Sequence, residues 1–247
     1  MVGSGGAGGA LGSGGSVVVA SGGVVGSGGT IVVVGSGGVV GSGGVTGTGG
    51  CGALIDDMES GTGQICQTTG RTGMWFTYVD AATTSSITPA AGGSVLPAVM
   101  STPRTSTSTR AMHISGIYST YAGIGVWPNS TNRAYVPGTY NASAYTGIHF
   151  WAKGTGSLIV VGQMPSTEST QYGGTCTLTT CEANELKYGA LSSSSWTEIS
   201  VPFSKLTGGS ATPFSPSAIW SLEFQYYSST SLGGASFDLW IDDLSFY

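Results

Sequence analysis

Short β-type segments separated by turn residues dominate the chain from Leu54 onward. About nine segments are rich in Val, Ile, Thr, Tyr, Phe and Trp and are bounded by Gly, Pro, Ser and Asn; they span residues 53–58, 75–80, 110–119, 122–127, 146–154, 157–164, 196–203, 219–227 and 237–246. None has a convincing helical period of 3.6 residues. In the segment 196–203, Ile199, Val201 and Phe203 share one face, as alternation in a strand requires. The pattern predicts an all-β fold built as a two-sheet antiparallel sandwich.

A sharp change in composition precedes these segments. Residues 1–52 consist almost entirely of Gly, Ser, Val, Ala and Thr, and no charged residue occurs before Asp56. Such a change marks a domain boundary. We therefore expect a Gly/Ser/Val-rich repeat arm over residues 1–52 and one sandwich domain over residues 53–247.

The arm repeats itself. Residues 17–29 are VVVASGGVVGSGG and residues 32–44 are VVVGSGGVVGSGG, fifteen positions further on. A flexible tether would need neither valines nor a register. Burying the valines of one unit contributes on the order of 5 to 10 kcal/mol, less than the roughly 15 kcal/mol of backbone entropy that ordering the unit costs.

An ordered arm would therefore need other copies of the chain to pack against. The side chains expected to carry this assembly are the valines Val17, Val18, Val19, Val24, Val25, Val32, Val33, Val34, Val39 and Val40.

Charge is scarce over the whole chain. Only 8% of the 247 residues are charged, and seven Lys plus Arg against twelve Asp plus Glu give a net charge of -5. Without a basic stripe, nucleic-acid binding is excluded as an interpretation. No run approaches the ~20 apolar residues of a membrane-spanning helix, so no membrane span is expected. Low charge with many Ser, Thr, Tyr and Trp residues is typical of an extracellular β protein.

Four cysteines support that compartment. Their spacing favours disulfides between Cys51 and Cys66 and between Cys176 and Cys181, although four cysteines allow three connectivities. A zinc site is the alternative, but neither histidine is spaced from a cysteine pair as in a zinc module. The pairs indicate an oxidising compartment, either extracellular or at the cell surface.

Several motifs resemble a known family. The stretches LIDDMESGTGQIC, GRTGMWFTYVD, AYTGIHFWAKG, WTEISVPFSKL and FDLWIDDLSFY are similar to the jelly-roll domains of the galactose-binding-like and carbohydrate-binding-module group of secreted bacterial proteins. The resemblance covers most of residues 53–247 and implies a jelly-roll sandwich with no required cofactor. It also implies a structural calcium ion held by Glu59 and Asp243. Solvated strand-end charges are the alternative role for these two acids.

Aromatic side chains are the candidate ligand-binding residues. Sugars stack on aromatic faces and bond to polar side chains at the rim. The candidates for such a glycan site are Trp75, Tyr78, Trp127, Trp151, Gln225 and Tyr227. About half of the aromatic residues in each strand must instead point into the core. Trp220 and Trp240, which lie in otherwise apolar segments, are expected there.

No pattern indicates catalysis. His113 and His149 each lie inside a predicted strand, and no G-x-S-x-G motif accompanies them. None of the Asp and Glu residues is marked as a glycosidase pair. We therefore expect a protein that is not an enzyme.

Two functions remain. The first is a non-catalytic extracellular structural protein, whose arms pack with other copies into a filament decorated by lectin-like jelly-roll domains. The alternative is a carbohydrate-binding module on a flexible Gly-rich tether, with polysaccharide as its partner. On the first hypothesis, deleting residues 1–50 abolishes assembly. On the second, the deletion changes only the distance over which the tethered domain can search.

Overall fold

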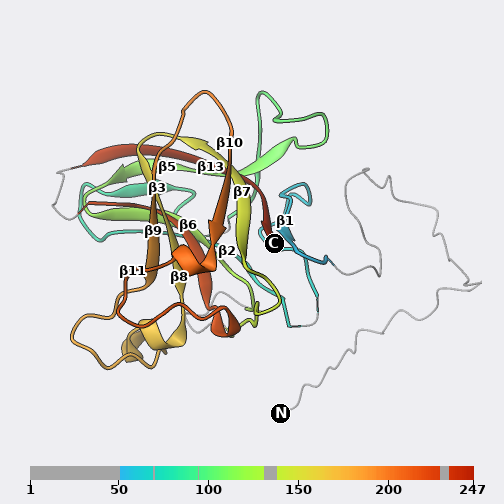
Figure 1. Cartoon of the computed structure of the whole chain (residues 1–247). Coiled ribbons are helices and arrows are strands. Elements are labelled where there is room, and N and C mark those ends of the chain that lie inside the picture. The colour runs from blue at the N-terminus through green and yellow to red at the C-terminus, as the bar shows by residue number, and fades with distance from the viewer. Residues whose placement is uncertain (1–50, 69, 94, 131–137, 229–233) are drawn as a thin grey trace, which may run out of the picture. The chain divides into compact units, whose positions relative to one another are not determined.

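The structure is a computed structural model, and it describes residues 51–68, 70–93, 95–130, 138–228 and 234–247. Figure 1 draws this part of the chain as a coloured ribbon. The arm up to residue 50 lies outside it. The ten valines from Val17 to Val40 that are predicted to assemble copies of the chain therefore lie outside the described residues.

Two antiparallel sheets form the described fold (Figure 1). The seven-stranded sheet has the order β10 (Thr197–Pro202), β7 (Gly147–Gly154), β13 (Ala235–Phe246), β5 (Arg110–Tyr118) and β3 (Ser86–Thr88), with β1 (Leu54–Asp56) paired to β13 and β4 (Ala98–Val99) paired to β5. The six-stranded sheet has the order β11 (Gly208–Gly209), β9 (Asn184–Ala190), β8 (Ser157–Gln163), β12 (Ser221–Tyr227), β6 (Tyr121–Trp127) and β2 (Met74–Val79). The all-β jelly-roll sandwich predicted from the sequence is confirmed.

Four short 3-10 helices lie in the connections that the structure describes. They are η1 (Pro165–Thr167), η2 (Thr170–Tyr172), η3 (Phe203–Lys205) and η4 (Pro216–Ala218). The first two lie between β8 and β9, which places them at one end of the six-stranded sheet.

Side chains from both sheets meet in one core. The ring of Phe150 on β7 makes an edge contact with Phe224 on β12, with centroids 4.6 Å apart, so this contact joins the two sheets. In β10, Ile199 and Val201 are buried while the intervening Ser200 is exposed, which confirms the predicted alternation. Each fully buried apolar side chain of this size contributes roughly 1.5 to 3 kcal/mol.

The two tryptophans expected in the core have different environments. Trp220 is buried, although it does not belong to the main cluster of buried apolar side chains. Trp240 is only half-buried, because the alternation of β13 turns it away from Leu239 and Ile241, which are buried. Its ring stacks on His113 of β5, with centroids 3.9 Å apart, on the outer face of the seven-stranded sheet.

Both disulfides predicted from the spacing are present. Cys51 bonds to Cys66, with Cα atoms 5.9 Å apart, and Cys176 bonds to Cys181, with Cα atoms 6.0 Å apart. The first ties the start of the described chain to the segment that precedes β2. By restricting the unfolded chain, a disulfide that closes a loop of this length stabilises the folded protein by about 3 kcal/mol. The second closes a short loop between η2 and β9.

Candidate functional site

The outer face of the six-stranded sheet is built from the polar and aromatic alternates of β2, β6 and β12. In β2, Trp75 and Thr77 are buried, so Phe76 and Tyr78 project from the opposite face. Strand pairing aligns side chains into rows that cross the three strands. One row contains Phe76, Gly125 and Glu223, and the next contains Tyr78, Gly123 and Gln225.

Two glycines of β6 leave room for the rings of β2. A Cβ atom on Gly123 would lie 2.5 Å from the hydroxyl oxygen of Tyr78, and one on Gly125 would lie 2.5 Å from Cζ of Phe76. Both distances are far below a van der Waals contact. The rings of Phe76 and Tyr78 therefore lie across β6, over the positions where other residues would carry side chains.

These rings form an aromatic patch, which we define as Phe76, Tyr78 and Trp127. Trp127 stacks on Phe76 with centroids 4.2 Å apart and planes 15° apart. Phe76 in turn contacts Tyr78, with centroids 6.0 Å apart. The three side chains therefore pack against one another on this face.

A pocket of about 650 Å³ opens beside the aromatic patch. Its walls come from β2, β6, β8, β12, the segment around η2 and residues 91–93. Besides the patch, its polar and aromatic lining includes Gln163, Glu168, Tyr172, Trp220, Ser221 and Glu223. A pocket of this volume with aromatic walls and a few polar groups is typical of a small-molecule or oligosaccharide site.

The polar side chains of this face form hydrogen bonds with one another. Ser221 donates a hydrogen bond of 2.6 Å to Glu223, and Gln163 donates one of 2.9 Å to Glu168. The Tyr78 hydroxyl donates to Oε1 of Gln225 over 3.1 Å. Burial raises the pKa of the Glu223 carboxyl above its ordinary value, and its hydrogen bonds only partly offset this.

Asp80, which directly follows β2, fixes the turn between β5 and β6. Its Oδ2 accepts hydrogen bonds from the backbone N–H groups of Ser119, Thr120 and Tyr121 at 2.7 to 3.0 Å, and its Oδ1 accepts one of 2.6 Å from Ser85. Burial raises the pKa of this carboxyl, but the hydrogen bonds outweigh burial and hold the pKa below its ordinary value. The end of β2 and the start of β6 are thereby locked together.

Four of the six glycan candidates from the sequence lie on this face. Tyr78, Trp127, Gln225 and Tyr227 all belong to β2, β6 or β12 and project outward. Sequence reasoning missed Phe76 and Glu223. Strict alternation in the stretch MWFTYV places Phe76 on the same face as the ligand candidate Tyr78.

Trp75 is corrected from a ligand candidate to a core residue. Only 2% of its surface is exposed, and its ring stacks on Phe224 inside the sandwich. Its Nε1 donates a 2.7 Å hydrogen bond to Oδ2 of Asp56. Trp75 and Phe76 are adjacent in a strand and so must face opposite sides, which excludes Trp75 from the outer face.

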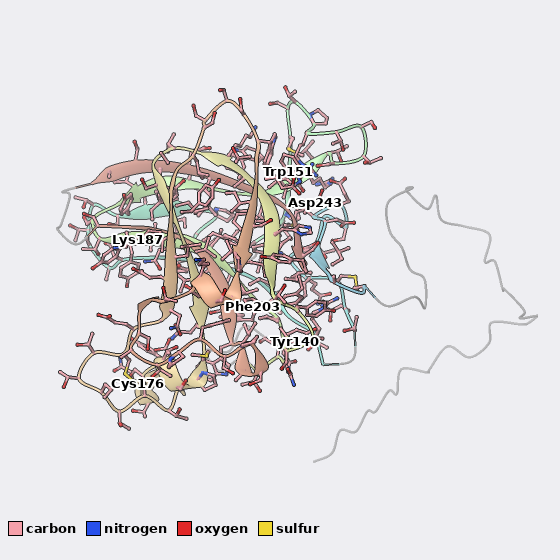
Figure 2. All side chains as sticks on the ribbon, viewed as in Figure 1. Tyr140, Trp151, Cys176, Lys187, Phe203 and Asp243 are labelled. Carbon is pink, nitrogen blue, oxygen red and sulfur yellow. A yellow bond between two sulfur atoms is a disulfide. The ribbon has the colours of Figure 1, made fainter. Side chains whose placement is uncertain are left out.

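Trp151 lies on the other sheet. It belongs to β7, where its register partner on β13 is Asp242, and Figure 2 shows it close to the labelled Asp243. The guanidinium of Arg104 lies 4.8 Å from the centre of its ring. Trp151 therefore does not share a surface with the aromatic patch.

The two acids implied as calcium ligands have protein partners. Glu59 accepts hydrogen bonds from the backbone N–H groups of Thr109 and Arg110, both at 2.8 Å, and from the Thr109 hydroxyl at 2.6 Å. Asp243 forms an ion pair with Arg104. Within the described part of the chain, no group of three or more His, Cys, Asp or Glu residues is arranged to hold a metal ion. Calcium at Glu59 and Asp243 stays a prediction from the resemblance.

Comparison with known families adds to this geometry. A family model described as carbohydrate binding domain 30 matches residues 92–247, well over half of the chain. The chain belongs to carbohydrate binding domain family 30. The match includes the pocket residues of β6, β8 and β12, whereas β2 lies just before it.

Solved structures similar to this family 30 chain include two modules from Clostridium thermocellum. A family 11 carbohydrate-binding module of a cellulosomal cellulase is 16% identical, with a TM-score of 0.45, and the match covers 78% of this chain and 92% of that chain. A family 30 module of another cellulosomal cellulase is 13% identical, with a TM-score of 0.36, and the match covers 70% of this chain and 97% of that chain. A search of curated proteins finds no match to the sequence.

Proposed function

We propose that this family 30 domain binds a polysaccharide on the outer face of its six-stranded sheet, in the pocket beside the aromatic patch. The observation that carries the proposal is the stack of Trp127, Phe76 and Tyr78 over the two glycines of β6. Aromatic faces bind the apolar faces of sugar rings, and orientation comes from a few polar groups. Here Glu223 and Gln163 supply such groups.

The charge of the pocket favours a neutral glycan. Its lining contains two carboxylates, Glu168 and Glu223, and none of the lysine, arginine or histidine residues that the structure describes. A polymer of uronic acids would bring like charges against these groups, which disfavours its binding. A neutral sugar can instead donate its hydroxyl protons to them.

The proposal follows the second of the two hypotheses from the sequence. Membership of a carbohydrate-binding family supports a module that binds glycans. No observation supports a filament, and the arm that would build it lies outside the described residues. A binding role without catalysis is proposed for the domain alone, not for every part of the protein.

We further propose that the protein acts outside the cell or at its surface. The two disulfides are typical of proteins in an oxidising compartment, which includes the space outside the cell. A domain that binds polysaccharides would find its ligand in that space. Within the described residues, no helix has the length and hydropathy that crossing a membrane requires.

Affinity electrophoresis tests the proposal. The full chain is run in native gels that contain soluble β-glucan, xyloglucan, galactomannan or xylan, with polygalacturonate and alginate as acidic polymers. We expect at least one neutral polysaccharide to retard the protein and Trp127→Ala to lower this affinity about tenfold or more.

Trp151→Ala is the matched control, because this tryptophan lies on the other sheet. It should be retarded as strongly as the unaltered protein. Free migration in all the gels would contradict the proposal, and so would an equal loss in both variants.

A further inference from the structure

The connection between β8 and β9 forms one wall of the pocket. We call residues 164–183 the pocket loop; it contains η1, η2 and Cys176, which Figure 2 labels. Two of its residues, Glu168 and Tyr172, line the pocket. Neither belongs to a strand, so their positions depend on contacts made within the loop.

Cys176 holds the backbone of Glu168 in place. The N–H of Cys176 donates a 3.0 Å hydrogen bond to the carbonyl of Glu168, and Cys176 also forms a parallel bridge with Ser169. Gly174 lies so close that a Cβ atom on it would be 1.9 Å from the same Glu168 oxygen. The segment that ends at Cys176 therefore packs directly against the backbone of Glu168.

The position of Tyr172 depends on the same contacts. Tyr172 ends η2, and its N–H donates a 3.0 Å hydrogen bond to the carbonyl of Ser169. The N–H of Gly174 donates to that carbonyl as well, also at 3.0 Å. Because Ser169 is bridged to Cys176, a displacement of Cys176 would move the base of η2 and with it the Tyr172 ring.

The disulfide to Cys181 anchors Cys176 from the other side. Cys176 is buried, whereas residues 177–180 are all exposed, and Leu178 among them is 67% exposed. Such exposed residues bury little apolar surface that could keep this part of the loop in one conformation. The bond between Cys176 and Cys181 joins the loop to the segment that leads into β9 and so limits its movement.

We propose that the disulfide between Cys176 and Cys181 positions Glu168 and Tyr172 at the pocket, so that the affinity for polysaccharide depends on the oxidised state of this pair. The inference rests on the proposed function and deepens it. A binding loop that is already held in its bound conformation loses less conformational entropy when the ligand arrives. Breaking the disulfide removes that advantage.

Reduction of the disulfide is a simple exchange reaction. A dithiol reductant attacks one sulfur, the bond between the two Sγ atoms breaks, and the reductant leaves as its own cyclic disulfide. It supplies two electrons and two protons, so that both cysteines end as thiols. Cys181 is only partly buried, which gives the reductant access to its sulfur.

Affinity electrophoresis of the full chain in both redox states tests the inference. Cys51→Ser/Cys66→Ser keeps only the disulfide of the pocket loop, so dithiothreitol acts on that bond alone. In gels that contain soluble β-glucan, xyloglucan, galactomannan or xylan, we expect reduction to lower the affinity about threefold to tenfold. Reoxidation with oxidised glutathione should restore it.

Cys176→Ser/Cys181→Ser is the matched variant in the otherwise unaltered chain. It should bind as weakly as the reduced protein, and dithiothreitol should not weaken it further. Thermal unfolding checks that each variant is folded. If Cys51→Ser/Cys66→Ser does not fold, the comparison of Cys176→Ser/Cys181→Ser with the unaltered chain decides the question.

A double-mutant comparison separates positioning from a general loss of stability. In Glu168→Ala/Tyr172→Ala, the two side chains through which the disulfide is proposed to act are absent. Removing the disulfide from this variant should therefore cost no further affinity. An equal loss with and without these side chains would overturn the assignment to Glu168 and Tyr172.

The remaining outcomes separate this inference from the proposed function. Equal affinities of the oxidised and reduced chains for a polysaccharide that binds would overturn the role of the disulfide and leave glycan binding intact. Free migration of the oxidised chain in every gel would overturn both proposals.

Discussion

The rings of Phe76 and Trp127 stack with centroids 4.2 Å apart, although they come from neighbouring strands that are about fifty residues apart in the sequence. The contact forms because Gly125 lies opposite Phe76 and leaves its ring free to lie across β6. The aromatic patch is therefore a property of the strand order β12-β6-β2, and small changes at the glycines should disturb it.

Gly125→Ala should displace the Phe76 ring. The new Cβ would lie 2.5 Å from Cζ of Phe76 and 2.8 Å from Cγ of Glu223, so both side chains must move. We expect polysaccharide affinity to fall about tenfold or more, because stacking geometry is lost. Affinity electrophoresis measures the loss. Ser200→Ala, at an exposed position of β10 on the other sheet, is the control; an unchanged affinity of Gly125→Ala would contradict the account.

Asp56 should make the stability fall as the pH rises. Burial raises its pKa from 3.8 to about 7, against hydrogen bonds from the Met58 N–H and from Trp75. Between these values the folded protein holds a proton that the unfolded chain has released, so stability decreases with pH across this window.

Urea unfolding at several pH values between about 4 and 8 measures this slope. Asp56→Asn should flatten it. Equal slopes in Asp56→Asn and the unaltered protein would show that Asp56 does not titrate in this way.

Asp80 should act in the opposite direction. Its hydrogen bonds lower its pKa below the ordinary 3.8, so its stabilisation is present above that value and is lost as the pH falls through the folded pKa. Asp80→Asn should cost about 1 to 3 kcal/mol near neutral pH and much less in strong acid. Unfolding by urea at both pH values gives the comparison. Glu182→Gln, at an exposed position, serves as the control. If Asp80→Asn lowered the free energy of unfolding equally at both pH values, the prediction would be wrong.

Arg104 should be essential for attaching the segment between β4 and β5 to β13. Its Nε lies 2.8 Å from Oδ2 of Asp242, a carboxylate with no exposed surface. Arg104→Met leaves that charge without its cation and should destabilise the domain by about 3 kcal/mol or more. Asp242→Asn in the same chain should restore part of the loss. A loss as small as that of the exposed Lys205→Met, measured by chemical unfolding, would contradict this role.

The fold could be predicted from local patterns, because alternation is a property of each strand alone. Ile199 and Val201 face inward as the sequence indicates. The same rule applied to Trp75 and Phe76 would have separated core from ligand face; choosing by residue type placed Trp75 on the wrong side. For Trp240 the prediction was wrong in the opposite direction: its apolar sequence neighbours suggested the core, but alternation turns its side chain to the outer face of the sheet.

The site could be predicted only in part, because it depends on which strands are neighbours. Tyr78 and Gln225 lie in one row because β6 separates β2 from β12 and presents Gly123 between them. No spacing in the sequence encodes that order. The pairing of Asp80 with the turn before Tyr121 is likewise a contact between distant segments.

The central claim is that glycan binds on the six-stranded sheet, and the six tryptophan side chains of the protein report it most directly. Two-dimensional NMR of the indole N–H groups, recorded while a polysaccharide-derived hexasaccharide is added, resolves each of them. We predict a large shift for Trp127, beside the pocket, and little change for Trp151, Trp196 and Trp240, which lie with the seven-stranded sheet. Shifts of those three with an unmoved Trp127 would place the ligand on the other sheet and contradict the account.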